Sequence, residues 1–382
     1  MKILHVSHTD ISTDSRILKE MAALQSLGWQ VLGLGVSMDE GAQKSCSVPD
    51  LDIWSCRLWM KRINFGWTLL NHCSRFLELS IRLFLRSIRF RPQIIHCHDM
   101  FVLPLAVIVK ILTGARLIYD AHELESDRNG LSKSHQKLVF LIEKISWKFI
   151  DRLITVSDAI DKWYLDNLGR KKSIVILNSP VEFRCSNPRV KTHVRKIFGI
   201  PRTLPVFISV GQLSNGRGID ITLEVFSSIE DEAAVIFMGF GEKVEKIREY
   251  SRRFSNIFFY PAVPHDEVVS ICRSCDCGIL LIENVSLSDF LCLPNKLFEY
   301  CFAEIPVIGS NFPEISRVIN QYQIGLTTEV SVESMKDTVR RMIADRNKFH
   351  VSRDSLIDLC WGTQENNLLA MYRELESDTK KD

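Results

Sequence analysis

The regular alternation of short apolar runs with amphipathic stretches constrains this chain more than any other feature. Lys2 to Val6 is a predicted strand, and residues 14–27 form a predicted helix that ends at Gly28. Further strands are predicted at residues 31–36, 94–98, 116–120, 153–156 and 174–177. Strands that alternate with helices build a parallel, doubly wound sheet. The first half of the chain is therefore predicted to be an α/β domain.

The same alternation restarts after a break at residues 178–205, which are rich in proline and polar side chains. The second series of predicted strands lies at residues 206–211, 234–238, 257–260, 278–282 and 306–310. A chain of 382 residues suggests two domains. We expect them at residues 1–180 and 181–355, followed by a C-terminal helix and tail at 356–382. Ligands of such sheets bind outside the carboxyl ends of the strands, so a cleft between the two domains is predicted.

Composition excludes several classes of protein. The formal charge of +2 is small for a nucleic-acid-binding chain, whose domains are usually strongly basic. We expect the 11 cysteines to be reduced, since Met1 to Ser7 lacks the pattern of a secretory signal. The most apolar stretch, Met100 to Leu112, is shorter than the ~20 residues that span a bilayer. The expectation is a cytoplasmic protein, soluble or peripheral on the inner face of a membrane.

Residues 294–306, which read PNKLFEYCFAEIP, lie between two predicted strands. A helix that opens at Pro294 would present free N–H groups and a partial positive charge, which suit a phosphate. Lys296 adds a full charge in the same turn, and Asn295 and Glu299 share one helix face. This pattern favours a nucleotide diphosphate, with the carboxylate of Glu299 near the ribose. The alternative is an amphipathic crossover helix with a good N-terminal stop.

The turn after the first strand of the second half reads GQLSNGRG, from Gly211 to Gly218. Its glycines would let backbone amides approach a phosphate, and Arg217 could neutralise a departing diphosphate. A turn with a solvated arginine is the alternative. Gly239 and Gly241 form a weaker signal, and neither half shows G-x-G-x-x-G after its first strand, which disfavours a nicotinamide enzyme.

Two polar clusters end predicted strands in the first half. Residues 120–123 read DAHE, and His96, His98 and Asp99 end the preceding strand. Strand ends that meet at one edge of a sheet would place these groups at the cleft, although lone histidines are more often structural. The histidines show no ligand spacing for a metal. Cys272, Cys275 and Cys277 likewise have no second Cys/His pair at zinc-site spacing nearby, so no metal is expected.

Residues 60–92 combine many arginines and lysines with apolar side chains. Arg75, Arg82, Arg86 and Arg89 recur at helical spacing, which indicates one basic stripe opposite apolar residues. A basic amphipathic helix can rest on an anionic membrane surface. The alternative is a crossover helix whose arginines are solvated.

Taken together, these motifs resemble the family-4 retaining glycosyltransferases, also called group 1, over nearly the whole chain. The resemblance is most specific at Pro294 to Tyr300, at Gly211 to Gly218, in the DAHE segment, and at the Asp14-Ser15-Arg16 opening of the first helix. It implies the GT-B fold, in which two Rossmann-like domains face a cleft. The C-terminal domain would bind a nucleotide-diphosphate sugar and the N-terminal domain a glycan or lipid-linked acceptor, as in surface polysaccharide biosynthesis.

The resemblance also implies a role for each motif residue. Glu299 looks like the carboxylate on the donor ribose, Arg217 resembles the cation on the diphosphate, and His122 looks like the histidine beside the transferred sugar. We expect Lys296 to assist Arg217, with no cofactor and no metal required. The remaining candidates are Gly211, Gln212, Gly239, Gly241, Asp289, Pro294 and Asn295 on the donor side, and Asp14, Arg16, His98, Asp99 and Glu123 on the acceptor side.

Two positions depart from the family pattern. The family often has a second glutamate eight positions before the one at Glu299, and here that position is Leu291. Asp289 could substitute for it. An arginine that commonly follows the glycine of the first C-terminal strand is Gln212 here, a loss for which Lys296 could compensate. The alternatives are therefore a nucleotide-sugar epimerase or hydrolase of the same fold, and a non-catalytic nucleotide-sugar-binding homologue.

Overall fold

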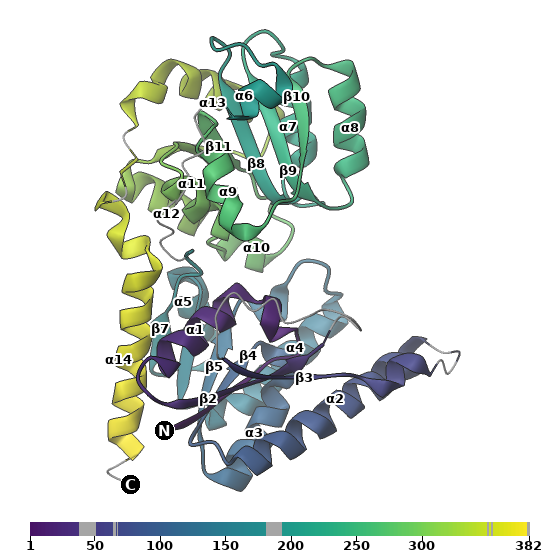
Figure 1. Cartoon of the computed structure of the whole chain (residues 1–382), viewed down its shortest axis with the longest axis vertical. Coiled ribbons are helices and arrows are strands. Elements are labelled where there is room, and N and C mark those ends of the chain that lie inside the picture. The colour runs from purple at the N-terminus through teal and green to yellow at the C-terminus, as the bar shows by residue number, and fades with distance from the viewer. Residues whose placement is uncertain are drawn as a thin grey trace. The chain divides into compact units, whose positions relative to one another are not determined.

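The computed structural model describes residues 1–37, 51–63, 66, 68–180, 193–349, 351–352 and 354–379. The chain divides into two compact units (Figure 1): unit 1 comprises Met1–Ile176 with Glu365–Asp382, and unit 2 comprises Leu177–Gln364. Parts of three sequence predictions lie outside the described residues. These parts are residues 181–192 of the predicted connection, residues 64, 65 and 67 of the basic segment, and residues 380–382 of the tail.

Unit 1 is built on a parallel sheet of seven strands in the order β3-β2-β1-β4-β5-β6-β7. This order reverses direction at β1, as a doubly wound sheet requires. The strands are β1 (Lys2–Val6), β2 (Gln30–Val36), β3 (Asp52–Cys56), β4 (Ile94–His98), β5 (Arg116–Ala121), β6 (Arg152–Thr155) and β7 (Ser173–Val175). The edge strand β3 was not predicted, because its half-buried, mixed sequence carries no clear apolar run.

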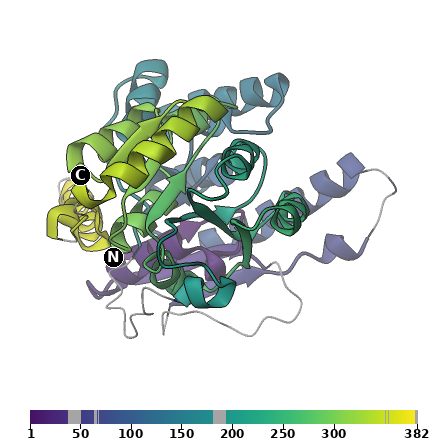
Figure 2. The same ribbon diagram turned by 90° about the horizontal axis from the view of Figure 1, so that it is seen from above.

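The helices of unit 1 connect these strands and cover both faces of the sheet. They are α1 (Ser15–Gln25), α2 (Thr68–Phe90), α3 (Leu103–Thr113), α4 (Lys133–Ser146) and α5 (Asp158–Leu168), with α14 (Trp361–Thr379) joining from Glu365 onward. In both views β3 and α2 run along each other (Figures 1 and 2), and the 3-10 turn Trp59–Arg62 lies between them in the chain. Among the described residues, none of the helices combines the length and the apolar character that crossing a bilayer needs.

Unit 2 repeats the design with six parallel strands in the order β10-β9-β8-β11-β12-β13. The strands are β8 (Val206–Gln212), β9 (Ala234–Phe240), β10 (Ile257–Pro261), β11 (Cys277–Leu280), β12 (Val307–Ser310) and β13 (Gly325–Thr328). The helices are α6 (His193–Phe198), α7 (Ile219–Ser227), α8 (Val244–Arg253), α9 (His265–Cys272), α10 (Leu287–Leu291), α11 (Asn295–Phe302), α12 (Pro313–Tyr322) and α13 (Val332–Asp345). Two parallel α/β sheets are thus confirmed, although the short edge strand β13 was missed.

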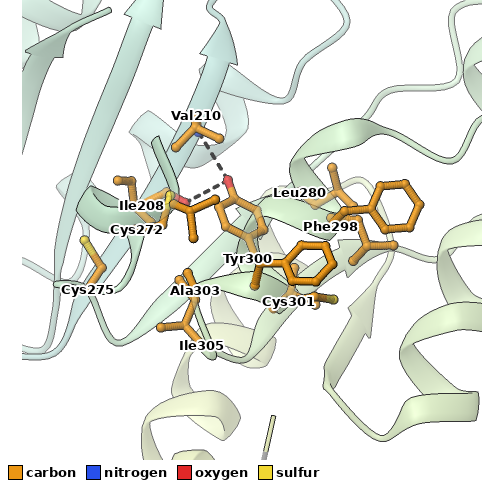
Figure 3. Close-up of a cluster of buried hydrophobic side chains, with 14 of the residues drawn as sticks. Ile208, Val210, Cys272, Cys275, Leu280, Phe298, Tyr300, Cys301, Ala303 and Ile305 are labelled. Carbon is orange, nitrogen blue, oxygen red and sulfur yellow. Dashed lines mark hydrogen bonds between the residues drawn. The ribbon is translucent and has the colours of Figure 1, made fainter. Parts of the chain in front are cut away.

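Helix α11 is fixed to its sheet by a buried tyrosine. The ring of Tyr300 lies among apolar side chains of β8, α9 and β11, as Figure 3 shows. Its hydroxyl accepts a hydrogen bond from Val210 N and lies within hydrogen-bonding distance of the carbonyls of Ile208 and Ile279. A buried hydroxyl that keeps its hydrogen bonds holds one helix position firmly. The neighbouring residue, Glu299, is therefore held in a defined place relative to β8.

Candidate functional site

The polar residues predicted in unit 2 gather at the carboxyl ends of β8, β9 and β11. Gly211 and Gly239 both have positive φ, at 101° and 153°. A Cβ atom on Gly239 would collide with the carbonyl oxygen of Gly211, and one on Gly241 would collide with that of Leu213. The two strand ends therefore approach each other more closely than side chains would allow. This close approach sets the path of the loop from Gly211 to Gly218.

The same loop is tied to the loop that follows β11. The backbone N–H of Gly218 donates to Glu283 Oε1 over 3.0 Å, and the N–H of Glu283 donates to the carbonyl of Gly216 over 3.0 Å. Arg217 Nη1 donates to Asp289 Oδ1 over 2.9 Å. Ser286 Oγ donates to the other oxygen of Asp289 over 2.8 Å. Asp289 was predicted to replace the glutamate that contacts the sugar, but its carboxylate forms an ion pair with Arg217.

Helix α11 begins at Asn295, and Pro294 is its extended N-cap residue with φ −72° and ψ 145°. The prediction of a helix opening at proline is therefore wrong by one position, because Pro294 keeps β-type dihedrals and precedes the first turn. Asn295 is exposed at the first helical position, with Lys296 next to it. The first amides of a helix lack intrahelical acceptors. An anion at this end would meet these amides and the ammonium of Lys296.

Burial and mutual repulsion perturb the ionisable groups of this site. Burial and the nearby guanidinium of Arg217 together lower the pKa of Lys296 to about 8, against the opposing effect of Glu299. Burial also raises the pKa of Glu299 to about 7, although Lys296 opposes the shift. His265 Nδ1 lies 3.7 Å from Glu299 Oε1. Two adjacent cations and a buried carboxylate titrating near neutral pH are typical of a ligand site. Gln212 is exposed at the end of β8 and adds no charge.

The predicted residues of unit 1 form a different kind of cluster, centred on the buried carboxylate of Asp120. Arg16 donates from Nε and Nη2 to its two oxygens over 3.0 and 2.8 Å, and from Nη1 to the carbonyl of Ile176 over 2.8 Å. Asp14 caps α1 by accepting from the N–H groups of Arg16 and Ile17. Burial would raise the pKa of Asp120, but Arg16 and His122 hold it well below its usual range.

His122 links this cluster to Asp99. Its Nε2 donates to Asp120 Oδ2 over 3.1 Å, and its Nδ1 lies 3.6 Å from Asp99 Oδ1. Burial lowers the pKa of His122, but the carboxylates of Asp99 and Asp120 outweigh burial and raise it to about 10. Asp99 itself has a φ of 64° directly after β4, a conformation that a residue with a side chain rarely adopts. Because its pKa is about 10, the imidazole of His122 is charged at neutral pH and acts as a hydrogen-bond donor.

Three further histidines lie side by side in the interior of unit 1. His5 Nδ1 and His98 Nε2 share a hydrogen bond of 2.9 Å, and His96 Nδ1 shares one of 2.8 Å with the hydroxyl of Tyr372 in α14. Burial lowers the pKa of His5, His96 and His98, which keeps them neutral. Glu20 lies beside them, with Oε2 3.6 Å from His96 Nε2.

These groups include the donor sets of the described residues that could hold a metal ion. Ligand atoms of His5, Glu20, His96 and His98 lie within 4.8 Å of one another, as do those of His98, Asp120 and His122. Imidazole and carboxylate are donors that zinc and other transition metals accept. The hydrogen bonds of Asp120 and His98, however, already direct their atoms to Arg16, His122 and His5. That no metal is required stays a prediction.

The second carboxylate of the predicted DAHE pair is separate from the cluster. The side chain of Glu123 is exposed, and its Oε2 lies 3.1 Å from Arg128 Nε. Asp120 is fully buried, so the two carboxylates do not flank His122 together. Strand β5 ends at Ala121, and His122 and Glu123 lie in the turn that follows it. That both carboxylates lie at the cleft edge stays a prediction.

Sequence reasoning missed several residues that the structure brings into the two clusters. Glu20 and His5 could have been found from the sequence, because each is a charged or polar residue on the predicted buried face of its element. Glu283 lies three positions after β11, and its acceptance of the Gly218 N–H could be predicted only from the path of the loop. His265 and Tyr372 lie far in sequence from their partners, and no local signal indicates them.

Comparison with known proteins identifies the family of the chain. Residues 190–354 match the family described as glycosyl transferases group 1, and residues 14–178 match the glycosyl transferase 4-like domain. A chitobiosyldiphosphodolichol beta-mannosyltransferase of Kluyveromyces lactis is 24% identical over 259 residues. The match covers 59% of this chain and 57% of that protein, so the chain spans little more than half the length of this relative.

Solved structures extend the likeness to the whole chain. Sucrose-phosphate synthase from Thermosynechococcus elongatus superposes with a TM-score of 0.77 at 15% identity, over 99% of this chain and 100% of that one. HepE from Anabaena in complex with UDP-glucose gives 0.73 at 14% identity, over 98% and 100%. At such low identity these structures establish the fold. With both halves matched to their families and the fold shared, the chain belongs to the group 1, or GT4-like, glycosyltransferases, which have the GT-B fold.

Proposed function

We propose that this chain transfers a sugar from a nucleotide-diphosphate sugar to a glycan or lipid-linked acceptor and retains the anomeric configuration. One observation carries the proposal. Lys296 lies in the first turn of α11, close enough to the guanidinium of Arg217 for its pKa to be lowered, and Glu299 follows one turn further along the helix. Two cations and free helix amides suit a diphosphate, and a carboxylate suits the hydroxyls of a ribose.

The reaction requires only charge stabilisation from these groups. The bond between the anomeric carbon and the diphosphate oxygen breaks, and the carbon gains oxocarbenium character. Arg217, Lys296 and the amide at Asn295 stabilise the charge on the departing diphosphate. The acceptor hydroxyl attacks from the face that the diphosphate leaves and passes its proton to a phosphate oxygen. The new bond therefore has the configuration of the old one, and no side-chain nucleophile is needed.

His122 acts in this scheme as a charged donor. With a pKa of about 10 it holds its proton at neutral pH, so it cannot serve as the base that activates the acceptor. A charged imidazole can donate a hydrogen bond to a sugar hydroxyl beside the reacting carbon. Asp99 and Asp120 keep it in that protonation state. This role is compatible with proton transfer from acceptor to phosphate.

The donor base and the acceptor are approached through the relatives. HepE was solved with UDP-glucose, which makes uridine diphosphate sugars the first donors to test. The name of the Kluyveromyces lactis relative specifies an acceptor on a diphosphodolichol lipid. We propose a lipid-linked glycan acceptor for this chain, in surface polysaccharide assembly at the inner face of a membrane.

The first experiment measures thermal stabilisation and turnover with uridine, guanosine, adenosine and cytidine diphosphate sugars. One nucleotide class should raise the melting temperature, and Glu299→Ala should remove that response. The exposed Glu245→Ala in α8 is the matched control. Stabilisation that survives Glu299→Ala would place the ribose elsewhere. With an acceptor mixture from membranes, proton NMR of the product then reports its anomeric configuration.

The same assay separates the alternatives. An epimerase or hydrolase would consume the donor equally fast without acceptor, whereas a transferase should be much faster with it. A specific observation favours the other alternative, a non-catalytic protein that binds nucleotide sugars. Leu291 replaces the expected carboxylate, and Asp289 is held by Arg217 rather than free for the sugar. That reading predicts donor binding without turnover in any acceptor mixture.

A further inference from the structure

Most of the exposed large apolar side chains in the described part of the chain lie between Trp59 and Ile145 in unit 1. The others are Ile197, Phe240, Val285 and Ile357. Single exposed apolar residues are ordinary, but a gathering of them over one region marks an interaction surface. This gathering is unrelated to the polar clusters described above.

The helices that carry these side chains form one layer. The connections β3 to β4, β4 to β5 and β5 to β6 all run in the same direction across the sheet. Right-handed crossovers therefore place α2, α3 and α4 on the same face. The contacts agree, since α3 packs against both α2 and α4 (Figure 1).

Each helix of the layer exposes an apolar stripe opposite its buried one. In α2 the residues Leu79, Leu83 and Ser87 are buried, and the stripe on the other side is exposed. The spacing is helical in all three elements, so the exposed stripes point away from the sheet. We call them together the apolar face: Leu77, Ile81 and Leu85 of α2, Ile108, Ile111 and Leu112 of α3, and Leu138, Leu141 and Ile145 of α4.

The basic residues of α2 lie beside this face. The sequence had suggested that the arginines lie opposite the apolar residues of the helix, but the exposed apolar stripe occupies the side opposite the buried residues. Arg82 Nη2 lies 2.9 Å from Glu78 Oε1, and its guanidinium lies 4.9 Å from the centre of the Trp59 ring. Arg86 covers Trp54 at 5.7 Å. In α4 the exposed Lys137 and Lys144 interleave with the apolar stripe at helical spacing, and the exposed Lys148 follows in the 3-10 turn Trp147–Phe149. Lysine stems can lie along apolar surface while their ammonium groups reach outward.

The described residues of these helices carry two carboxylates, and both are engaged within the unit. Glu78 accepts from the N–H groups of Trp59 and Met60. Glu143 is buried and accepts from the hydroxyls of Tyr119 and Tyr164. The face is therefore apolar and cationic without outward-facing acidic groups. Two copies would bring like charges together, which disfavours self-association through this face.

We propose that the apolar face docks on an anionic lipid bilayer. An amphipathic surface with Lys and Arg beside exposed apolar residues suits the interface of an anionic leaflet, where both kinds of side chain gain contacts. The proposal deepens the proposed function, on which it rests, by naming the surface that would meet the membrane of a lipid-linked acceptor. Vesicle binding is measured without donor or acceptor, so failure of one proposal is distinguishable from failure of the other.

The experiment measures co-sedimentation of the full chain with phosphatidylcholine vesicles, with and without phosphatidylglycerol. Wild type should bind the anionic vesicles and release in high salt. Ile81→Glu, Ile111→Glu and Ile145→Glu change side chains that are 50%, 61% and 60% exposed, so folding should be little affected. Each substitution should weaken vesicle binding roughly tenfold, because a charge replaces an apolar side chain that the bilayer would otherwise bury.

Matched controls lie in unit 2. Ile197→Glu and Ile357→Glu alter side chains that are 50% and 60% exposed and should bind as wild type does. Lys144→Glu tests the electrostatic part without disturbing Glu78, which reversal of Arg82 would do. Circular dichroism melts and the donor-induced thermal shift verify that every variant is folded.

Three results would overturn the proposal. Wild type could fail to bind anionic vesicles, or the three face variants could bind as well as the two controls. Light scattering could also show a wild-type dimer that the face variants abolish while vesicle binding is absent, which would make the face a protein interface. Loss of vesicle binding with an intact donor response supports the membrane assignment.

Discussion

The polar cluster of unit 1 and the polar site of unit 2 differ in how their charged groups are paired. Around Asp120, each charged group faces an opposite charge, and the pKa of the carboxylate is held low. Around Lys296, two cations face each other, and the ammonium and the carboxylate of Glu299 titrate near neutral pH. The first cluster is stabilised by its own partners, whereas in the second Arg217 is paired with Asp289 and still repels Lys296.

This difference separates a framework from a binding site. A closed network of buried charges fixes the ends of β4 and β5 relative to α1 and presents His122 in one protonation state. An anionic ligand stabilises two cations that repel each other, since it attracts both of them. We infer that substitutions in unit 1 act mainly on folding and substitutions in unit 2 mainly on donor use.

The largest effect is expected from Asp120→Ala, which removes the hub of the closed network. Arg16 would keep the carbonyl of Ile176 and the side chain of Glu20 but would lose both oxygens of Asp120. Breaking a buried ion pair typically costs about 3 to 5 kcal/mol. Urea unfolding compared with wild type measures the loss. Asp166→Ala, in an exposed pair with Lys162, is the control and should change stability little. A loss for Asp120→Ala as small as that of the control would contradict the framework role.

The second effect is on catalysis and concerns the open site. Arg217→Ala should reduce turnover at least about tenfold, because one of the cations on the diphosphate is lost. Melting temperature should change little by comparison, since Ser286 still bonds Asp289. Arg248→Ala in α8, an exposed cation paired with Glu245, is the matched control. Unchanged turnover would remove Arg217 from the scheme.

A third effect is the pH dependence of kcat/KM for the donor, which reports the free enzyme. Glu299 accepts from ribose only when ionised, so activity should fall as pH drops below about 7. Lys296 assists only when protonated, so activity should fall as pH rises above about 8. Lys296→Arg should abolish the alkaline limb, because arginine keeps its charge. An alkaline limb unchanged in that variant would assign it to another group.

The sequence predicted the two sheets well and the contents of the sites only in part. Apolar runs such as Val206 to Val210 indicate strands because burial on both faces leaves a nearly continuous apolar pattern. The edge strands β3 and β13 are short and half-buried, so they lack that pattern. Motif residues were found from turn chemistry and from resemblance to a family.

Pairings were harder to predict because they depend on tertiary distance. Arg16 and Asp120 are 104 positions apart, and no local rule joins them. The capture of Asp289 by Arg217 likewise depends on how two loops pack. By contrast, Glu20 lies one helical turn after Arg16 on a buried face, a signal that sequence alone contained.

The smallest effect would sharpen the contrast by adding charge to the open site. Gln212→Arg restores the cation that the family pattern places after Gly211, at an exposed strand end. Donor affinity measured by calorimetry should rise roughly two- to tenfold at low salt and less at high salt, as expected for an exposed charge. The added cation should also lower the pKa of Lys296 further, so the gain in donor affinity should shrink above pH 8.

Gln25→Arg adds the same charge to unit 1 and should leave donor affinity unchanged. Equal affinities for the two variants would mean that the loop after β8 does not meet the diphosphate, and the open site would then be confined to α11.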